Sequence, residues 1–174
     1  AHRAGQQLED ILNMAPNVNF AGGTSRARYF QIRGVGDRSQ FQEPLNPSVG
    51  VLIDGVDFSG IGSVGTLFDV SQVEVLRGPQ GILFGKNTLG GAINVRSAAP
   101  VVGEGLSGRV AASFESDNGE YFEGHISGSV SENVAMRLAV MDRSIDGYLD
   151  NVNLAAAYPN SPTTDETIAR IGLQ

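Results

Sequence analysis

The stretch VEVLRGPQGILFGKNTLGGAINV, residues 73–95, decides how the rest of the chain is interpreted. It opens with an apolar run, Val73 to Leu76, which predicts a largely covered strand that ends at Arg77-Gly78-Pro79. The chain then returns as a second short strand, Ala92 to Arg96. Between and beside these strands, glycine recurs at Gly78, Gly81, Gly85, Gly90 and Gly91. Glycine at this density indicates a backbone that turns tightly or lies against another surface.

Two glycine patterns suggest nucleotide chemistry, and both fail on their context. A P-loop requires G-x-x-x-x-G-K-[ST], but Gly85-Lys86 is preceded five residues earlier by Gln80 and followed by Asn87. Residues 60–65 form a complete G-x-G-x-x-G, yet too few residues separate them from the next strand to hold the required helix. The chain also offers no nucleophile paired with a base and no metal cluster, so we expect neither an enzyme nor a bound cofactor or metal.

Residues 73–95 resemble the segment that closes the plug domain of TonB-dependent outer-membrane receptors, whose pattern runs approximately IEVLRGPxGxLYGxxAxGGxINV. The match is long and ungapped, with mild departures at Phe84 and Thr88. Ile32-Arg33-Gly34 and the strand Val49 to Ile53, closed by Asp54-Gly55, resemble two further elements of the same family. The resemblance implies that the plug backbone depends on Gly34, Asp54, Gly55, Gly78, Pro79, Gly81, Gly85, Gly90 and Gly91.

The segment before this stretch predicts short elements. Helical spacing of apolar residues over 6–14 is stopped by Ala15-Pro16-Asn17, and Asn17 tolerates the left-handed conformation that the turn needs. Short strands are expected at 18–20 and 28–33, and 40–47 is a polar surface loop.

The pattern changes after Gly105. Residues 106–114, 122–130 and 134–140 each alternate apolar and polar side chains, and 167–173 begin a fourth such run. Segments of about ten residues with period two are typical of transmembrane β-strands, although a soluble antiparallel sheet gives the same alternation. The polar segment 143–164 is expected to be an extended loop, and 131–133 a tight periplasmic turn.

Composition limits the partners. The 174 residues carry a net charge of −7 and no cysteine, which argues against a nucleic-acid partner and excludes disulfides. No apolar run is long enough for a transmembrane helix, and no signal peptide is recognised at Ala1.

We therefore expect an α+β plug domain with a small mixed sheet and short helices, followed by antiparallel strands of a truncated transmembrane β-barrel. The plug is assigned to 1–99 without its TonB box, a linker to 100–105, and the first barrel strands to 106–174. Four strands cannot close a barrel in lipid, so the chain is expected to be a fragment.

The resemblance implies an active importer in the Gram-negative outer membrane. Its partners would be TonB, outer-membrane lipid and a scarce bulky ligand, most often a ferric siderophore, with no covalent chemistry. The alternative is a soluble periplasmic or extracellular α+β binding module with an attached β-sheet.

Arg33, Arg77 and Glu74 are candidates for contacts between plug and barrel. Arginine pairs bidentately with carboxylates, and the resembled family places the two arginines opposite barrel glutamates. Alternatively each pairs within the plug, with Glu74 or another acid. His125, one of the polar positions of its alternating strand, is a candidate ligand contact. The same role is expected of the surface loop at Gln40, Phe41, Gln42 and Glu43.

Overall fold

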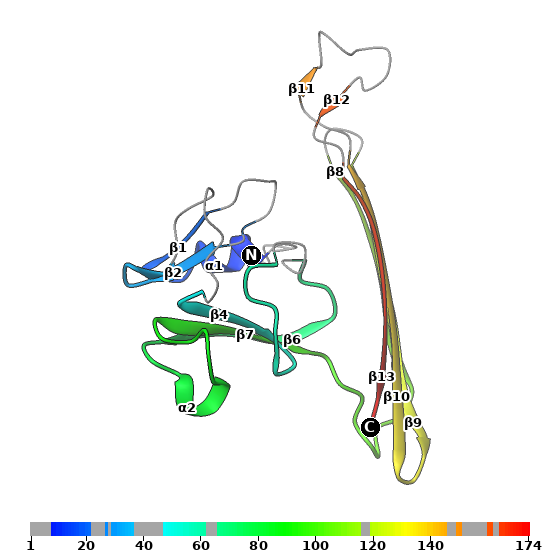
Figure 1. The fold of residues 1–174 in the computed structure, drawn as a ribbon. Helices are drawn as coiled ribbons and strands as arrows, with labels where there is room; N and C mark the ends of the chain where they lie inside the picture. Colours follow the sequence, from blue (N-terminus) through cyan, green and yellow to red (C-terminus); the bar gives the residue numbers. More distant parts are fainter. Residues whose placement is uncertain are drawn as a thin grey trace. The chain divides into compact units, whose positions relative to one another are not determined.

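The computed structural model describes residues 8–21, 27, 29–36, 47–61, 66–115, 119–145, 149–150, 160–161 and 164–174. The chain forms two compact units, Ala1–Ala98 and Ala99–Gln174, which we call unit 1 and unit 2 (Figure 1). None of the helices in the described part of the chain has the length and apolarity needed to cross a membrane.

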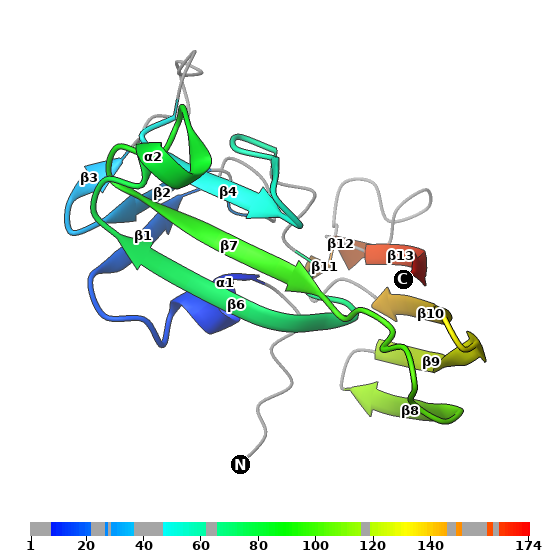
Figure 2. The same cartoon turned by 90° about the horizontal axis from the view of Figure 1, so that it is seen from below.

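A four-stranded sheet is the centre of unit 1. Its strands are β4 (Val49–Ile53), β5 (Val56–Asp57), β6 (Val70–Arg77) and β7 (Gly91–Ser97), in the order β5-β4-β7-β6. Figure 2 shows β4, β7 and β6 side by side. The pair β4–β7 is parallel and the other two pairs are antiparallel, so the sheet is mixed, as expected. Because β4 and β7 are parallel, their carboxyl ends lie at the same edge of the sheet.

A smaller antiparallel sheet contains β1 (Val18–Ala21), β2 (Tyr29–Ile32) and β3 (Val35–Gly36). The helices are short: α1 covers Leu8–Leu12 and α2 covers Gly81–Phe84. Within the described residues α1 ends before the expected Met14, because Asn13 and Met14 already form a turn. Asn17 has φ 61°, the left-handed conformation that the sequence predicts for it.

The core of unit 1 lies between α1 with β2 and one face of the β4–β7 pair. Alternate residues of β7 point to this face, and Ile93 is completely buried there. Leucines of α1, one helical turn apart, cover the same cluster. The buried members are Leu8, Leu12, Ala27, Phe30, Ile32, Val49, Val51, Ile93 and Val95.

Unit 2 is an antiparallel sheet of long strands. The strands are β8 (Ser107–Glu115), β9 (Gly119–Ser131), β10 (Val134–Ile145) and β13 (Thr164–Leu173), in the order β13-β10-β9-β8. A separate pair, β11 (Leu149–Asp150) and β12 (Asn160–Ser161), follows β10. The fold class is confirmed: a small α+β unit is followed by antiparallel strands that do not close a barrel within the described residues.

The expected loop at 143–164 is wrong at both ends. Strand β10 continues to Ile145, and β13 already begins at Thr164. The polar residues there do not end the pairing, because their side chains bond across the strands: Ser144 Oγ donates to Asp165 Oδ1 over 2.6 Å. A polar pattern predicts exposure, but it does not prevent a ladder from continuing.

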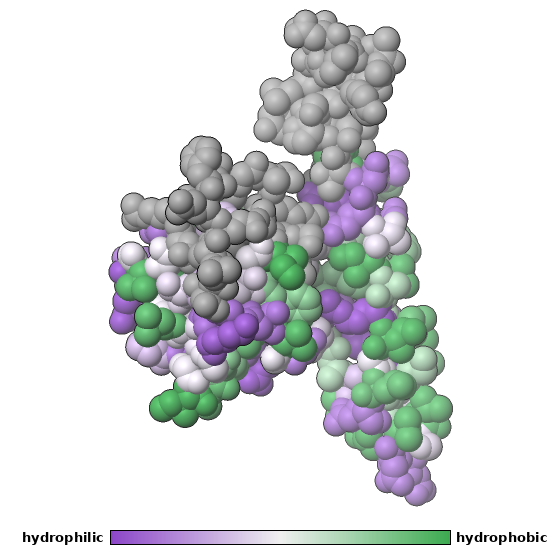
Figure 3. Space-filling model, in the orientation of Figure 1, coloured by the Kyte–Doolittle hydropathy of each residue, from purple (hydrophilic) through white to green (hydrophobic). Residues whose placement is uncertain are grey.

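The two faces of unit 2 differ in polarity, as the alternation predicts. On β10 the odd-numbered positions, which belong to the more polar face of the sheet, include the buried residues Ala135, Ala139 and Met141. The large apolar residues of the opposite face are exposed, and hydrophobic surface gathers over these strands (Figure 3). The exposed set includes Leu106, Val110, Phe114, Phe122, Ile126, Val130, Val134, Met136, Leu138, Val140, Ile171 and Leu173.

Candidate functional site

Two tight hairpins of unit 1 carry motif residues at their tips. Arg33-Gly34 joins β2 to β3, and Asp54-Gly55 joins β4 to β5. All four residues have positive φ, at 54°, 81°, 50° and 82° in chain order. Two consecutive left-handed residues between paired strands form a type I′ turn, whose twist matches that of the strands.

Arg33 is an unusual residue for the first position of such a turn. Asparagine, aspartate and glycine are favoured there, whereas the left-handed conformation costs another L-residue about 1–2 kcal/mol. The backbone N–H of Arg33 donates to the carbonyl of Asn17 over 2.8 Å, and the side chain is exposed. A strained exposed arginine is an observation from which a functional role can be inferred.

Gly90 and Gly91 let the β2–β3 hairpin approach the start of β7. A Cβ on Gly90 would lie 2.7 Å from Val35 Cγ1, and one on Gly91 would lie 2.7 Å from Ile32 Cδ1. Gly91 is also the cross-strand partner of Arg77. The close packing at the two glycines therefore brings the hairpin that carries Arg33 beside the strand end that carries Arg77.

The other motif positions act mainly through the backbone. Gly78 and Gly85 have φ of 97° and 74° with open space around them, so conformation rather than crowding requires glycine there. Pro79 is exposed, and nothing in the described structure explains Gly81, which has open space and begins α2.

The loop after α2 is tied to the β4–β5 hairpin through Asp57. Ser59 donates to its carboxylate from both backbone and hydroxyl, and Asn87 Nδ2 donates over 2.8 Å. Partial burial acts to raise the pKa of Asp57, but the hydrogen bonds from Ser59 and Asn87 and the nearby charge of Lys86 outweigh it and lower the pKa below its ordinary 3.8. The carboxylate is therefore ionised in neutral solution.

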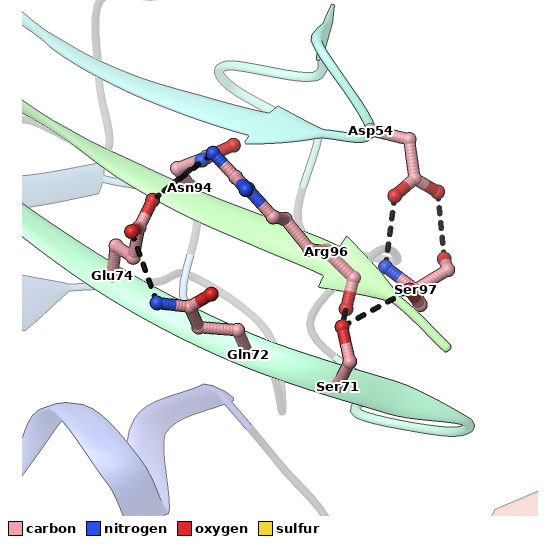
Figure 4. A network of polar contacts seen from close by, with 7 residues as sticks. All are labelled: Asp54, Ser71, Gln72, Glu74, Asn94, Arg96 and Ser97. Carbon is pink, nitrogen blue, oxygen red and sulfur yellow. Dashed lines mark hydrogen bonds and ion pairs between the residues drawn. The ribbon is translucent and has the colours of Figure 1, made fainter. Parts of the chain in front are cut away.

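Glu74 is engaged within unit 1. Its carboxylate accepts hydrogen bonds from Gln72 over 3.0 Å and Asn94 over 2.9 Å, and Arg96 lies 3.9 Å away (Figure 4). Among the described residues its partners therefore do not include Arg33 or Arg77. The Arg96–Glu74 pair contributes little stability, because its atoms are 3.9 Å apart and the Arg96 side chain is exposed to water, which screens the charges.

Asp54 has a partner that sequence reasoning missed. Its Oδ1 accepts a hydrogen bond from the Ser97 backbone N–H over 2.8 Å, and its Oδ2 accepts one from the Ser97 hydroxyl over 2.6 Å (Figure 4). The Asp-Gly pair signals a turn, but the partner lies 43 residues away, beyond the reach of local sequence patterns.

His125 lies on the polar face of unit 2. In the register it stands between Arg109 on β8 and Ala139 on β10, and Arg170 continues the row. Close to His125 on the same strand, the Tyr121 hydroxyl donates to Glu123 Oε2 over 2.7 Å. This face can offer several charged and hydrogen-bonding groups to a polar partner. Residues 40–43 of the expected ligand loop lie outside the described residues.

A compact α+β unit with glycine-packed hairpins, followed by antiparallel strands with one apolar face, defines the class: a plug domain followed by a β-sheet. The family model described as TonB-dependent Receptor Plug Domain matches residues 1–92. The chain belongs to this family.

Several proteins are similar to the chain. The pesticin receptor of Yersinia pestis is 37% identical over 99 residues, which are 56% of this chain and 14% of the receptor. The vitamin B12 transporter BtuB of Vibrio vulnificus is 25% identical over 150 residues, 82% of this chain and 23% of that protein. The chain thus spans less than a quarter of either relative.

Solved structures share the fold over nearly the whole chain. The ferric yersiniabactin uptake receptor FyuA of Yersinia pestis matches with a TM-score of 0.80 and 25% identity, covering 98% of this chain and 26% of FyuA. The pyoverdine outer membrane receptor FpvA of Pseudomonas aeruginosa PAO1 matches with a TM-score of 0.67 and 18% identity, covering 97% of this chain and 25% of FpvA. Plug and long strands therefore occur together in these receptors as in this chain.

Proposed function

We propose that this chain is the plug and the first barrel strands of a TonB-dependent importer in the Gram-negative outer membrane. In this proposal residues 1–99 are the plug, 100–105 the linker and 106–174 the first strands. The observation that carries it is the exposed apolar face of unit 2, on a chain whose plug family is known. The alternative, a soluble binding module, would leave that face in water.

The dimensions of the apolar face suit a bilayer. On β9 the exposed apolar residues extend from Phe122 to Val130, which spans about 27 Å along a strand at about 3.4 Å per residue. A tilt of about 40° reduces this to roughly 21 Å, close to the apolar band of roughly 25 Å in outer-membrane barrels.

The same face becomes polar toward one end of the strands. Beyond Val140 and its neighbour Ala169, the next outward pair is Asp142 and Thr167, joined by a 2.6 Å hydrogen bond. Carboxylates are costly in hydrocarbon but tolerated near an interface. We infer that the hydrocarbon boundary lies near this pair, with the β9–β10 turn at the periplasmic side.

Arg33 and Arg77 are the proposed contacts of the plug with the barrel wall. Both side chains are exposed, and neither has an ion-pair partner among the described residues. Conformational strain at Arg33 supports a role that no favoured turn residue could perform, and bidentate pairing with carboxylates suits a wedge that can be released.

The proposed cargo is a ferric siderophore. Two similar receptors, for ferric yersiniabactin and for pyoverdine, are named for siderophores, whereas BtuB is named for vitamin B12. Ligand contacts are proposed at His125 and at the loop of Gln40, Phe41, Gln42 and Glu43. TonB would supply the energy that moves the plug.

Uptake by living cells tests the proposal. The source bacterium with this gene deleted, or with TonB deleted, is given a panel of radiolabelled ferric siderophores, haem and cobalamin under iron limitation. We expect both deletions to abolish uptake of one ferric siderophore, and the intact gene to restore it. If only cobalamin uptake were lost, the cargo would be cobalamin and not a ferric siderophore. A protein that fractionates with soluble periplasm, with all uptake unchanged, would contradict import.

A further inference from the structure

The carboxyl end of β7 is held from two neighbouring strands at once. Besides the two hydrogen bonds from Ser97 to Asp54, the Ala98 N–H donates to the carbonyl of Asp69 over 2.8 Å. The Ser71 hydroxyl lies 3.1 Å from the carbonyls of both Arg96 and Ser97, close enough to donate to either (Figure 4). Residues 96–98, the last two of β7 and the residue after it, are thus bound by groups from the turn after β4 and from Asp69 and Ser71 at the start of β6.

Local backbone geometry positions each of these groups. Asp54 follows the last residue of β4, and since β4 and β7 are parallel, it reaches the end of β7. Its own N–H donates to the carbonyl of Val95 over 3.0 Å, which continues the ladder by one step. On the other side, an irregularity in the β6–β7 register between Val70 and Gln72 leaves Ser71 without a cross-strand partner, so its side chain can turn to the β7 carbonyls.

The Asp54–Ser97 contact is the strongest part of this arrangement. A carboxylate that accepts from both the N–H and the hydroxyl of one residue makes two charge-assisted hydrogen bonds, which are stronger than neutral ones. Two bonds to a single residue also fix its orientation. Ser97 is the last residue of β7, so the contact lies directly at the end of the strand.

Unit 1 ends at Ala98, one residue beyond this contact. Any tension along the chain between the two units therefore acts first on residues 96–98. When the end of a strand is pulled away from its sheet, the strand separates from its neighbours one hydrogen-bonded pair at a time, and the bonds at the loaded end are then the first to oppose separation.

We propose that Asp54, Asp69, Ser71 and Ser97 form an exit clamp, which prevents β7 from separating from the sheet when unit 2 pulls on it. Asp54 is the residue on which the clamp depends. The clamp concerns the stability of the strand end and goes beyond the proposed import function, since it holds for any cargo.

Hydrogen exchange in the full-length protein, without ligand, tests the clamp. With Asp54→Ala we expect the amides of Ser97 and Ala98 to exchange at least about tenfold faster, as loss of charge-assisted bonds implies. Val51 and Ile93 should keep their protection. Asp57→Ala is the matched control, because Asp57 is in the same hairpin but bonds Ser59 and Asn87, and it should leave Ser97 and Ala98 unchanged.

The response of Ala98 separates a clamp from an isolated contact. Ala98 bonds Asp69, not Asp54, so its faster exchange requires that the strand end open as a unit. Unchanged exchange at both amides, or a change at Ser97 alone, would overturn the proposal.

Two milder variants cover the case in which Asp54→Ala fails to fold. Ser97→Ala keeps the backbone bond to Asp54 and removes only the hydroxyl, and Asp54→Asn keeps one neutral acceptor. Both should raise exchange at Ser97 and Ala98 by an intermediate amount, about threefold for the loss of roughly half of the contact. Wild-type exchange in both variants would likewise overturn the clamp. None of these results depends on uptake, so the clamp can fail while the importer proposal stands.

Discussion

Unit 1 and unit 2 contain similar apolar side chains, but unit 1 buries them in a core and unit 2 exposes them on one face of its sheet. In unit 1 the central apolar residues are covered by other parts of the same unit: Leu12 and Ile93 are 0% exposed. In unit 2 the corresponding residues face outward, with Phe114 81% and Val130 70% exposed, whereas Ala135 on the polar face is 0% exposed. Period-two alternation therefore predicts that one face of a sheet is apolar, but only the structure shows whether that face is covered, as in unit 1, or exposed, as in unit 2.

The glycine packing of unit 1 gives the largest expected effect. Gly91→Ala should destabilise unit 1 by about 3 kcal/mol or more, since the new Cβ meets Ile32 and the backbone of Leu76 in addition to the cost of a positive φ. Gly55→Ala, also at positive φ but in open space at a type I′ turn, should cost only about 1 kcal/mol. Urea-dependent exchange of the Ile93 amide in the intact protein measures both, and equal losses would contradict the packing role.

A charge on the apolar face of unit 2 comes next. Leu138→Arg should reduce the stability of the membrane-assembled protein by about 2–4 kcal/mol, whereas Thr167→Arg, on the same face near the polar end, should cost about 0–1 kcal/mol. Heat-modifiable mobility after extraction from the outer membrane compares the two. If both variants assemble like the wild type, this face does not meet lipid.

Arg33 allows stability and function to be separated. Arg33→Asn should stabilise unit 1 by about 1 kcal/mol, because asparagine tolerates the left-handed turn position, while it weakens uptake if the arginine contacts the barrel. Arg77→Gln should weaken uptake without the gain in stability, since Arg77 lies in a strand. Thermal unfolding and uptake are measured on the same preparations, and full uptake by both variants would remove the arginines from the proposed contact.

The smallest effect concerns pH. Because the pKa of Asp57 is lowered on folding, its contribution to stability is fully present above the ordinary value of 3.8 and is lost as the pH falls through the lower folded value. Asp57→Asn should remove this part of the acid dependence, and the change is small because the carboxylate is largely exposed. Urea midpoints between about pH 2 and pH 6 provide the measurement. An unchanged acid limb would show that Asp57 does not contribute.

Local pattern was sufficient to predict much of the fold. The strand Val49–Ile53 and the alternation that forms β8, β9, β10 and β13 were readable because apolar periodicity determines which side chains face a core or a membrane. The two-residue strands β3 and β5 were not predicted, because such short pairs are determined by their turns.

The site residues were less predictable than the elements. Arg33 and Asp54 were recognised from motif position, but the turn strain of the first and the Ser97 partner of the second depend on tertiary geometry. The continuation of β10 through Arg143 to Ile145 was missed because cross-strand hydrogen bonds between polar side chains leave no apolar period. Long-range polar contacts are the part that a single sequence does not reveal.

The most direct test of the account is an accessibility scan along β10 in the intact protein in bilayers. Residues 1–174 contain no native cysteine, so a single cysteine introduced at each position from 134 to 141 carries the one nitroxide label in this part of the protein. We expect oxygen accessibility to alternate, high at Val134, Met136, Leu138 and Val140 and low at the positions between them. Accessibility without alternation, or equal exposure of these four positions to a water-soluble relaxing agent, would contradict the claim that unit 2 places its apolar face in lipid.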